Sequence, residues 1–202
     1  MKKFERRRIE LRDELVTRIK DKIEQGRDVA ILSSGDPSLF GPAYWYAEGF
    51  EKENLEIVPG AGAFSAAMAA LETSSLPACD SRFVIKTAPA FLFGKAPISE
   101  QEEAGRILQD ISRYQGTLAF YMALPRIHNL VRKLRKNYSP DLPMAVVYNA
   151  GYPEKEQIVK GSLDTILEKI REVEENWLGL VIVGPCLEQG DPYRDCLEGI
   201  AK

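Results

Sequence analysis

The chain has 202 residues, of which 45% are hydrophobic and 28% are charged. This composition is typical of a soluble globular protein with one large domain or two small ones. The net charge of −3 provides no broad cationic surface, which argues against nucleic acid and anionic lipid as partners. The basic opening MKKFERRR is not followed by an apolar stretch that suits a signal peptide or a membrane span, so we expect no membrane partner.

The first 78 residues alternate between helix and strand patterns. One apolar stripe predicts a core-facing helix that ends near Gly26. The stripe is formed by Leu11, Leu15, Ile19 and Ile23. DVAIL (28–32) and LEIV (55–58) predict buried strands on either side of a helix over residues 42–52. This order predicts a parallel pair with a right-handed crossover, and a small-residue helix follows in PGAGAFSAAMAALE (59–72).

The periodic pattern lapses at SSLPACDS (74–81), so we expect one domain over residues 1–78 and a second over residues 79–202. Five runs of the second domain predict strands: RFVIKT (82–87), TLAFYM (117–122), PMAVVYN (143–149), QIVKG (157–161) and LGLVIVG (178–184). Helices are expected near residues 99–114, 125–137 and 162–175. QIVKG follows PMAVVYN too closely for a helical crossover, so this pair should be antiparallel and the sheet mixed. The expected fold class is therefore α/β.

Three cysteines and a single histidine limit the available chemistry. Cys79, Cys186 and Cys196 are scattered, without the paired spacing of a metal site, which argues against a zinc centre and fits a reducing, cytoplasmic compartment. His128 lies in a helical pattern, RIHNLVRKL, and we interpret it as structural. Unless His128 is a base, Ser-His-Asp and Cys-His chemistry is disfavoured. Neither GxxxxGK[ST] nor GxGxxG is present, which disfavours nucleotide hydrolysis.

The loop SSGDPSLFG (33–41) follows the first predicted strand. In open α/β sheets, ligands bind beyond the carboxyl ends of strands, where loops expose backbone amides. Gly35 permits close backbone approach, and Asp36 offers an acceptor to an amine or a hydroxyl. Alternatively, Asp36 and Ser38 cap the next helix, and the turn alone does not decide between these roles.

Four other strand ends are candidates for the same site. Gly60 and Gly62 follow the second predicted strand and either admit a flat ligand or allow tight helix packing. Met122 ends a strand and is either a pocket residue or core filler. The remaining two ends, at Asn149–Gly151 and at Gly184, are either ligand loops or plain turns.

Taken in order, these loops resemble the signature of the tetrapyrrole methylase family. ILSSGDPSLFG is similar to its Gly-Asp-Pro loop, LEIVPGAGAFSAAMAAL to its Val-Pro-Gly segment, and TLAFYMAL to its Tyr-Met strand end. The similarity continues through SPDLPMAVVYNAGYPEKEQIVKGSLDTI and LGLVIVGP, so it covers nearly the whole chain. Within the family, YSPDLPMAVVYNAGYPEKEQIVKGSL most resembles precorrin-4 methyltransferases, which act at carbon 11 in cobalamin synthesis.

The resemblance implies a cytoplasmic, two-domain homodimer that transfers a methyl group from S-adenosylmethionine to a tetrapyrrole. The methyl donor would lie between the domains. Carried over by motif, one wall of its pocket comes from Ser34, Gly35, Asp36 and Leu39, with Gly62 and Ala63 beside them. Met122 and Ala150 would close the pocket from the second domain. No catalytic residue and no metal ligand are assigned.

Two segments depart from the family pattern. TAPAFLFGKAPISEQEE (87–103) lacks the arginine-rich TRxxGRTP-like pattern of the precorrin-4 group. The family also begins with a strand and a GxGPGDP loop, whereas this chain opens on a helix, so we expect an incomplete parallel sheet in the first domain. A truncated or remodelled member, or a partner chain that covers the gap, would each account for this.

Two functional hypotheses follow from these observations. The first is an S-adenosylmethionine-dependent methyltransferase acting on a precorrin, with precorrin-4 as the expected substrate. The second is a catalytically inactive or regulatory homologue that keeps the fold without the donor site. Methyl transfer to RNA or to a protein residue is a further possibility. The acidic isoelectric point argues against RNA as the acceptor.

Overall fold

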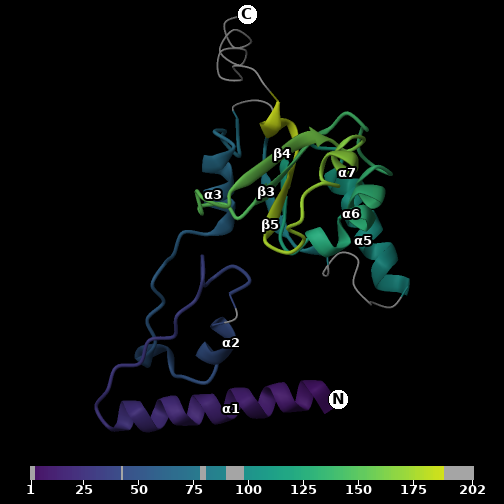
Figure 1. Ribbon diagram of the computed structural model, residues 1–202. Coiled ribbons are helices and arrows are strands. Elements are labelled where there is room, and N and C mark those ends of the chain that lie inside the picture. Colours follow the sequence, from purple (N-terminus) through teal and green to yellow (C-terminus); the bar gives the residue numbers. More distant parts are fainter. Residues whose placement is uncertain (1–2, 42, 78–80, 90–97, 189–202) are drawn as a thin grey trace, which may run out of the picture. The chain divides into compact units, whose positions relative to one another are not determined.

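The computed structural model describes residues 3–41, 43–77, 81–89 and 98–188 (Figure 1). Its internal contacts divide the chain into two compact units, Met1–Gly62 and Ala63–Lys202. We describe each unit by itself. Within the described residues, no helix is both long enough and apolar enough to cross a bilayer.

The first unit consists of one long helix and a segment of short turns. Helix α1 covers Lys3–Glu24, and the predicted end near Gly26 is confirmed. Gly26 has a φ of 74°, its N–H donates to the Ile23 carbonyl and the Arg27 N–H donates to the Lys22 carbonyl. These bonds satisfy two of the carbonyls that every helix end leaves open. Of the predicted stripe, Ile19 is buried and Ile23 is exposed, while Val16 provides the second buried contact.

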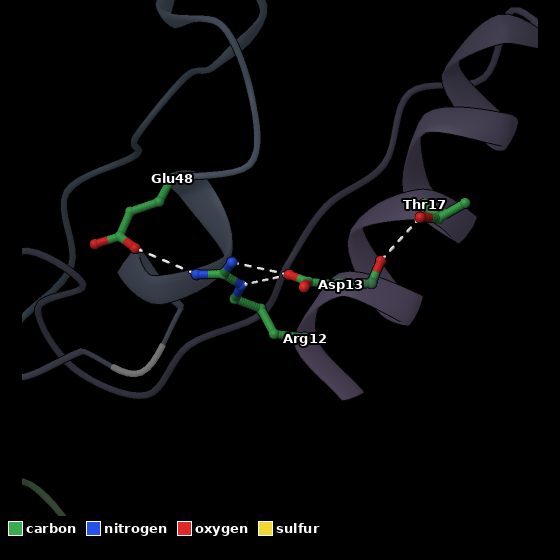
Figure 2. Close-up of polar contacts among 4 residues, drawn as sticks. All are labelled: Arg12, Asp13, Thr17 and Glu48. Carbon is green, nitrogen blue, oxygen red and sulfur yellow. Dashed lines mark hydrogen bonds and ion pairs between the residues drawn. The ribbon is translucent and has the colours of Figure 1, made fainter. Parts of the chain in front are cut away.

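Helix α1 packs against the short helix α2, Tyr44–Ala47, which precedes a 3₁₀ turn, η1, at Lys52–Asn54. The guanidinium groups of Arg8 and Arg12 lie 5.3 and 5.4 Å from the centroid of the Trp45 ring. Arg12 also donates to Asp13 and forms an ion pair of 3.5 Å with Glu48, as Figure 2 shows. Two guanidinium groups over one ring, and one ion pair, thus join the helices.

The helix predicted over residues 42–52 is therefore much shorter than expected. A β-carbon at Gly49 would lie within 3 Å of both methyl carbons of Val16, so the missing side chain is what allows α1 to approach here. Gly49 follows α2 directly, within the turn that ends it. Glycine also weakens a helix interior, which contributes to the early end of α2.

The parallel strand pair predicted at 28–32 and 55–58 is not formed. Neither segment has backbone ladder bonds in the described part of the first unit, and every strand of the described residues lies in the second unit. Leu32 is 94% exposed and Val58 is 70% exposed. Parallel strands are stable when both faces and both edges are covered, and two strands alone are marginal. The apolar runs supply strand propensity, but the described residues of this unit supply no such cover.

The second unit contains the mixed sheet that the sequence predicts. Its strands are β1 (Val84–Thr87), β2 (Thr117–Phe120), β3 (Pro143–Tyr148), β4 (Gln157–Ser162) and β5 (Gly179–Val183). They lie in the order β1-β2-β5-β3-β4. The β1–β2 pair is parallel and the other three pairs are antiparallel, including the predicted β3–β4 pair. The expected α/β class with a mixed second sheet is confirmed.

Helices cover both faces of this sheet (Figure 1). Helix α3, Ala63–Ala70, packs Phe64, Ala67 and Met68 against one face. The other face is covered by α5 (Ile98–Ile111), α6 (Ile127–Leu134) and α7 (Ile166–Lys169). Side chains of β3 and β5 alternate between the two clusters and are almost all fully buried, which explains their continuous apolar sequences. His128 is exposed on α6.

Two short 3₁₀ helices complete the second unit, η2 at Leu124–Arg126 and η3 at Pro185–Leu187. Helix α7 is shorter than the helix predicted over 162–175 and turns after Lys169. Helix α3 precedes the predicted domain boundary at residues 78 and 79 but packs with this unit. The predicted domain limits, 1–78 and 79–202, stay a prediction.

Candidate functional site

In the first unit, the loop that contains Gly35 and Asp36 packs against the loop of residues 59–62. A β-carbon placed on Gly62 would lie 3.1 Å from the Asp36 Cβ, and one on Gly35 would lie 3.7 Å from the Ala61 carbonyl oxygen. A β-carbon on Gly60 would collide with the Gly35 carbonyl oxygen. Glycine is therefore required at position 60 and is favoured at position 35 by its φ of 74°, and the contact leaves little room for a side chain at position 62. The structure brings together Gly35, Asp36 and Gly62, which the sequence placed in one pocket wall.

Asp36 uses part of its carboxylate within its own loop. The backbone N–H of Ser38 donates to Asp36 Oδ1 at 2.8 Å, and the Ser38 hydroxyl lies 2.6 Å from the same oxygen. This is a turn held by a side-chain acceptor rather than a helix cap, because α2 begins only at Tyr44. Leu39 closes the turn through its N–H, which donates to the Asp36 carbonyl at 3.3 Å, and its side chain is half-buried.

Ser33 is a candidate that sequence reasoning missed. Its hydroxyl oxygen is buried and has no hydrogen-bond partner within the described residues. The neighbouring Ser34, which the sequence favoured, is exposed. A buried hydroxyl without a partner costs free energy, so an acceptor or donor supplied by a ligand would be favourable here. The sequence did carry a signal for Ser33. Side chains alternate along an extended segment, so Ser33 and Ser34 point to opposite sides and only one of them can face a buried site.

In the second unit, β1, β2 and β3 run in the same direction, so their carboxyl ends lie together. We call this end of the strands the carboxyl edge of the sheet. Phe120 and Val146 both lie opposite Val181 on β5, so Met122 is level with Tyr148. Two strand spacings, about 10 Å, separate them. Met122 and the loop that follows β3 therefore border the same stretch of the sheet edge.

Backbone conformation is unusual at this edge. Met122, Asn149 and Gly151 have φ values of 53°, 48° and 84°. Such left-handed conformations cost free energy for residues other than glycine and are concentrated at functional sites. The side chain of Met122 is 50% exposed, so it is available to a ligand and is not core filler.

Ala150 lies against α3 in the same unit. Its side chain packs on the cluster that contains Phe64, and a β-carbon on Gly151 would lie 3.6 Å from the Ala66 Cβ. The Gly151 N–H donates to Glu156 Oε2 at 2.9 Å, which fixes the loop. The structure thus brings Ala150 next to the helix that begins at Ala63, with Met122 at the same sheet edge.

The turn before β5 completes this edge. Glu175 accepts hydrogen bonds from the N–H groups of Leu178 and Trp177 at 2.9 and 2.7 Å, and these bonds lower the pKa of its carboxyl group. Burial, followed by the charge of Glu175, raises the pKa of Tyr148. The Asn149 N–H donates to the Leu178 carbonyl at 3.0 Å, which ties the turn to the end of β3.

The sequence profile of the family described as Tetrapyrrole (Corrin/Porphyrin) Methylases matches residues 2–167. The chain belongs to this family. It is 32% identical over 179 residues to the cobalt-precorrin-4 C(11)-methyltransferase of Methanocaldococcus jannaschii, covering 87% of the chain and 66% of that relative. The chain therefore spans about two thirds of the relative's length.

Solved structures of tetrapyrrole methylases share the fold. A cobalt precorrin-4 methyltransferase superposes with a TM-score of 0.74 at 24% identity, over 88% of this chain and 72% of the other. The uroporphyrin-III C-methyltransferase of Thermus thermophilus, complexed with S-adenosyl homocysteine, superposes with a TM-score of 0.55 at 22% identity, over 76% and 64%. The family resemblance and the closest subgroup predicted from the loop motifs are confirmed.

The predicted site residues are divided between the two units of this family member. Ser34, Gly35, Asp36, Leu39 and Gly62 belong to the first unit, and Ala63, Met122 and Ala150 belong to the second. Within each unit the structure brings them close to one another or to one edge. Residues 90–97 of the segment that departs from the arginine-rich pattern (87–103) lie outside the described residues.

Proposed function

We propose that this chain is an S-adenosylmethionine-dependent methyltransferase that acts on a precorrin of the cobalamin pathway, namely precorrin-4 with or without cobalt, at carbon 11. The observation that carries the proposal is the 32% identity to a relative named for that reaction. The catalytically inactive alternative is not favoured, because the matched relative is named as a methyltransferase.

The residues of the first unit fit the polar part of S-adenosylmethionine. Gly35, Gly60 and Gly62 keep side chains out of the space where two backbones meet, and Asp36 stabilises the turn that presents their amides. The buried Ser33 hydroxyl adds a polar group that gains a partner when a ligand arrives. In this proposal Ser34, Gly35, Asp36 and Leu39 line the donor pocket with Gly62.

The candidate residues of the second unit fit the apolar part of S-adenosylmethionine. Met122 and Ala150 lie at the carboxyl ends of the strands, and Ala63 begins the helix on which the Ala150 loop packs. These small or flexible apolar residues suit a flat ring and a thioether. S-adenosylmethionine, when bound, supplies the methyl group. The chain would align donor and acceptor and exclude water, since methyl transfer to carbon is a single displacement that needs no covalent nucleophile.

Isothermal titration with S-adenosylhomocysteine, followed by methylation assays with precorrin-4 and with cobalt-precorrin-4, tests the proposal. We expect binding in the micromolar range and a product heavier by one methyl group. The matched pair Gly62→Ala and Gly105→Ala localises the site. A β-carbon on Gly62 would press on Asp36, whereas one on Gly105 in α5 meets nothing within 4 Å among the described residues.

Only Gly62→Ala should weaken S-adenosylhomocysteine binding. Absence of heat at high micromolar concentration would support the inactive homologue. Binding without methylation of either precorrin would point to a different acceptor.

A further inference from the structure

Lys86 is a basic residue on an outer strand of the second unit's sheet, and the proposed function does not yet use it. It lies on β1, an edge strand of the sheet. Val84 packs on the face of the sheet that α3 covers. Side chains alternate along a strand, so Lys86, two residues after Val84, lies on the same face. Its Nζ lies 4.5 Å from the centroid of the Phe64 ring, one residue after Ala63. The ammonium group is therefore held at the start of α3.

The charge of Lys86 is not neutralised within the described residues. No carboxylate of that part of the chain lies within 4.0 Å of Nζ, and Lys86 is exposed. A cation above an aromatic face is attracted to it but keeps its full charge for an anion. The first turn of α3 also carries no acidic residue. This corner of the sheet therefore presents a positioned positive charge that no carboxylate of the described residues compensates.

The register places this charge beside the proposed site. Lys86 lies opposite Ala119 on the parallel strand β2, three residues before Met122. That separation is about 10 Å along the strand. Ala150 packs on the same cluster as Phe64, the residue under the ammonium group. The cation thus lies at the margin of the area bordered by Ala63, Met122 and Ala150.

We propose that Lys86 binds a peripheral carboxylate of the tetrapyrrole acceptor and orients the ring. This inference rests on the proposed function. Precorrins carry acetate and propionate side chains around their rings, and a macrocycle placed over the site extends these groups to its margin. An ammonium on a flexible stem suits a carboxylate at variable distance. Lys86 is thus a positioning residue that selects anionic acceptors and takes no part in bond formation.

The test compares Lys86→Met, which keeps an apolar stem over Phe64 without the charge, with Lys86→Arg, which keeps the charge. Lys160→Met is the matched control, because Lys160 is an exposed lysine on β4, the opposite edge strand. The probe is uroporphyrin, a fluorescent tetrapyrrole octacarboxylate, titrated at low and at high salt. S-adenosylhomocysteine affinity is measured on the same proteins.

We expect Lys86→Met to bind uroporphyrin about fivefold more weakly at low salt and to lose this difference at high salt. Lys86→Arg and Lys160→Met should stay within twofold of the unmodified chain, and S-adenosylhomocysteine affinity should not change. In methylation assays the KM for the precorrin should rise with kcat retained.

Uroporphyrin affinity within twofold for Lys86→Met would overturn the proposal. An equal loss of S-adenosylhomocysteine affinity would also overturn it, by assigning Lys86 to the donor's carboxylate. Failure of the proposed function is separate, since it appears as an unmodified chain that neither binds S-adenosylhomocysteine nor methylates a precorrin.

Discussion

Asp36 fixes its own loop and lies against the second loop of the proposed donor site. Its Oδ1 atom accepts from both the N–H and the hydroxyl of Ser38, and these bonds fix the turn. The same carboxylate lies against Gly62, where the second loop approaches. A side chain that shapes the loop can therefore affect donor binding without a change in the rest of the pocket.

Replacement of Asp36 by alanine should weaken S-adenosylhomocysteine binding by about tenfold, because a charged acceptor of two hydrogen bonds is lost. Ser38→Ala keeps the backbone bond and should cost about threefold or less. Asp36→Asn separates shape from charge, since it retains an oxygen acceptor at the same position. Titration calorimetry measures all three variants. An affinity for Asp36→Ala within twofold of the unmodified chain would remove Asp36 from the site.

Tyr138 shows the cost of an unsatisfied group in the core of the second unit. Burial raises its pKa to about 12, and its hydroxyl has no hydrogen-bond partner among the described residues. The raised pKa means that the folded state favours the neutral phenol. Its ionisation therefore leaves the free energy of unfolding unchanged below pH 10, the usual pKa, and lowers it as the pH rises from 10 toward about 12.

Tyr138→Phe should therefore increase the free energy of unfolding at pH 7 by up to about 1 kcal/mol, because it removes an unsatisfied buried hydroxyl. The advantage of the variant should grow above pH 10, since the unmodified chain then loses stability through phenol ionisation in the unfolded state. Urea unfolding at pH 7 and pH 10.5 measures both effects. A less stable variant at pH 7 would indicate a partner for the hydroxyl.

At the scale of elements, the strands of the second unit lie close to where the sequence predicts them. The runs of β3 and β5 are buried on both faces, and a strand of this kind needs no alternating pattern to be recognised. The short loop after β3 allowed the antiparallel β3–β4 pair to be predicted. The insertion of β5 between β2 and β3 was not predictable, because local patterns carry no information on which strands become neighbours.

Residues of the candidate site were predictable where glycine or a strand end marked them. Gly35, Gly62 and Met122 interrupt regular patterns, and the structure places them at loop contacts or a strand terminus. Ser33 and Lys86 were missed because their significance depends on burial and on a partner across the chain. The strands expected at 28–32 and 55–58 were wrong for a related reason, since apolar runs form a sheet only when neighbours cover them.

The contact between α1 and α2 gives a prediction at the same scale. Arg12→Ala removes the ion pair to Glu48 and one cation above Trp45, so the free energy of unfolding of the first unit should fall by about 1 kcal/mol. Trp45 fluorescence in a Trp177→Phe background reports on this unit. Arg7→Ala is the control, because the ion pairs of Arg7 lie within α1. Equal effects of the two variants would contradict the proposed role of Arg12.

At the scale of the whole molecule, the two units differ in how their apolar residues are covered. The second unit buries both faces of its sheet, whereas the first leaves apolar side chains of 28–32 and 55–58 exposed. The predicted homodimer stays a prediction, and light scattering on the purified chain with and without S-adenosylhomocysteine tests it.

Hydrogen exchange should separate the two units. Backbone amides of 28–32 and 56–58 lack hydrogen bonds in the described part of the chain, so they should exchange at least about a hundredfold faster than those of β3. S-adenosylhomocysteine should slow exchange in the loops at 34–39 and 59–63, while β4 serves as an unaffected reference. Slow exchange at 28–32 without ligand would show that this segment is paired in solution, because exchange protection requires a bonded amide. That result would support the parallel strand pair that the apolar pattern predicts at 28–32 and 55–58.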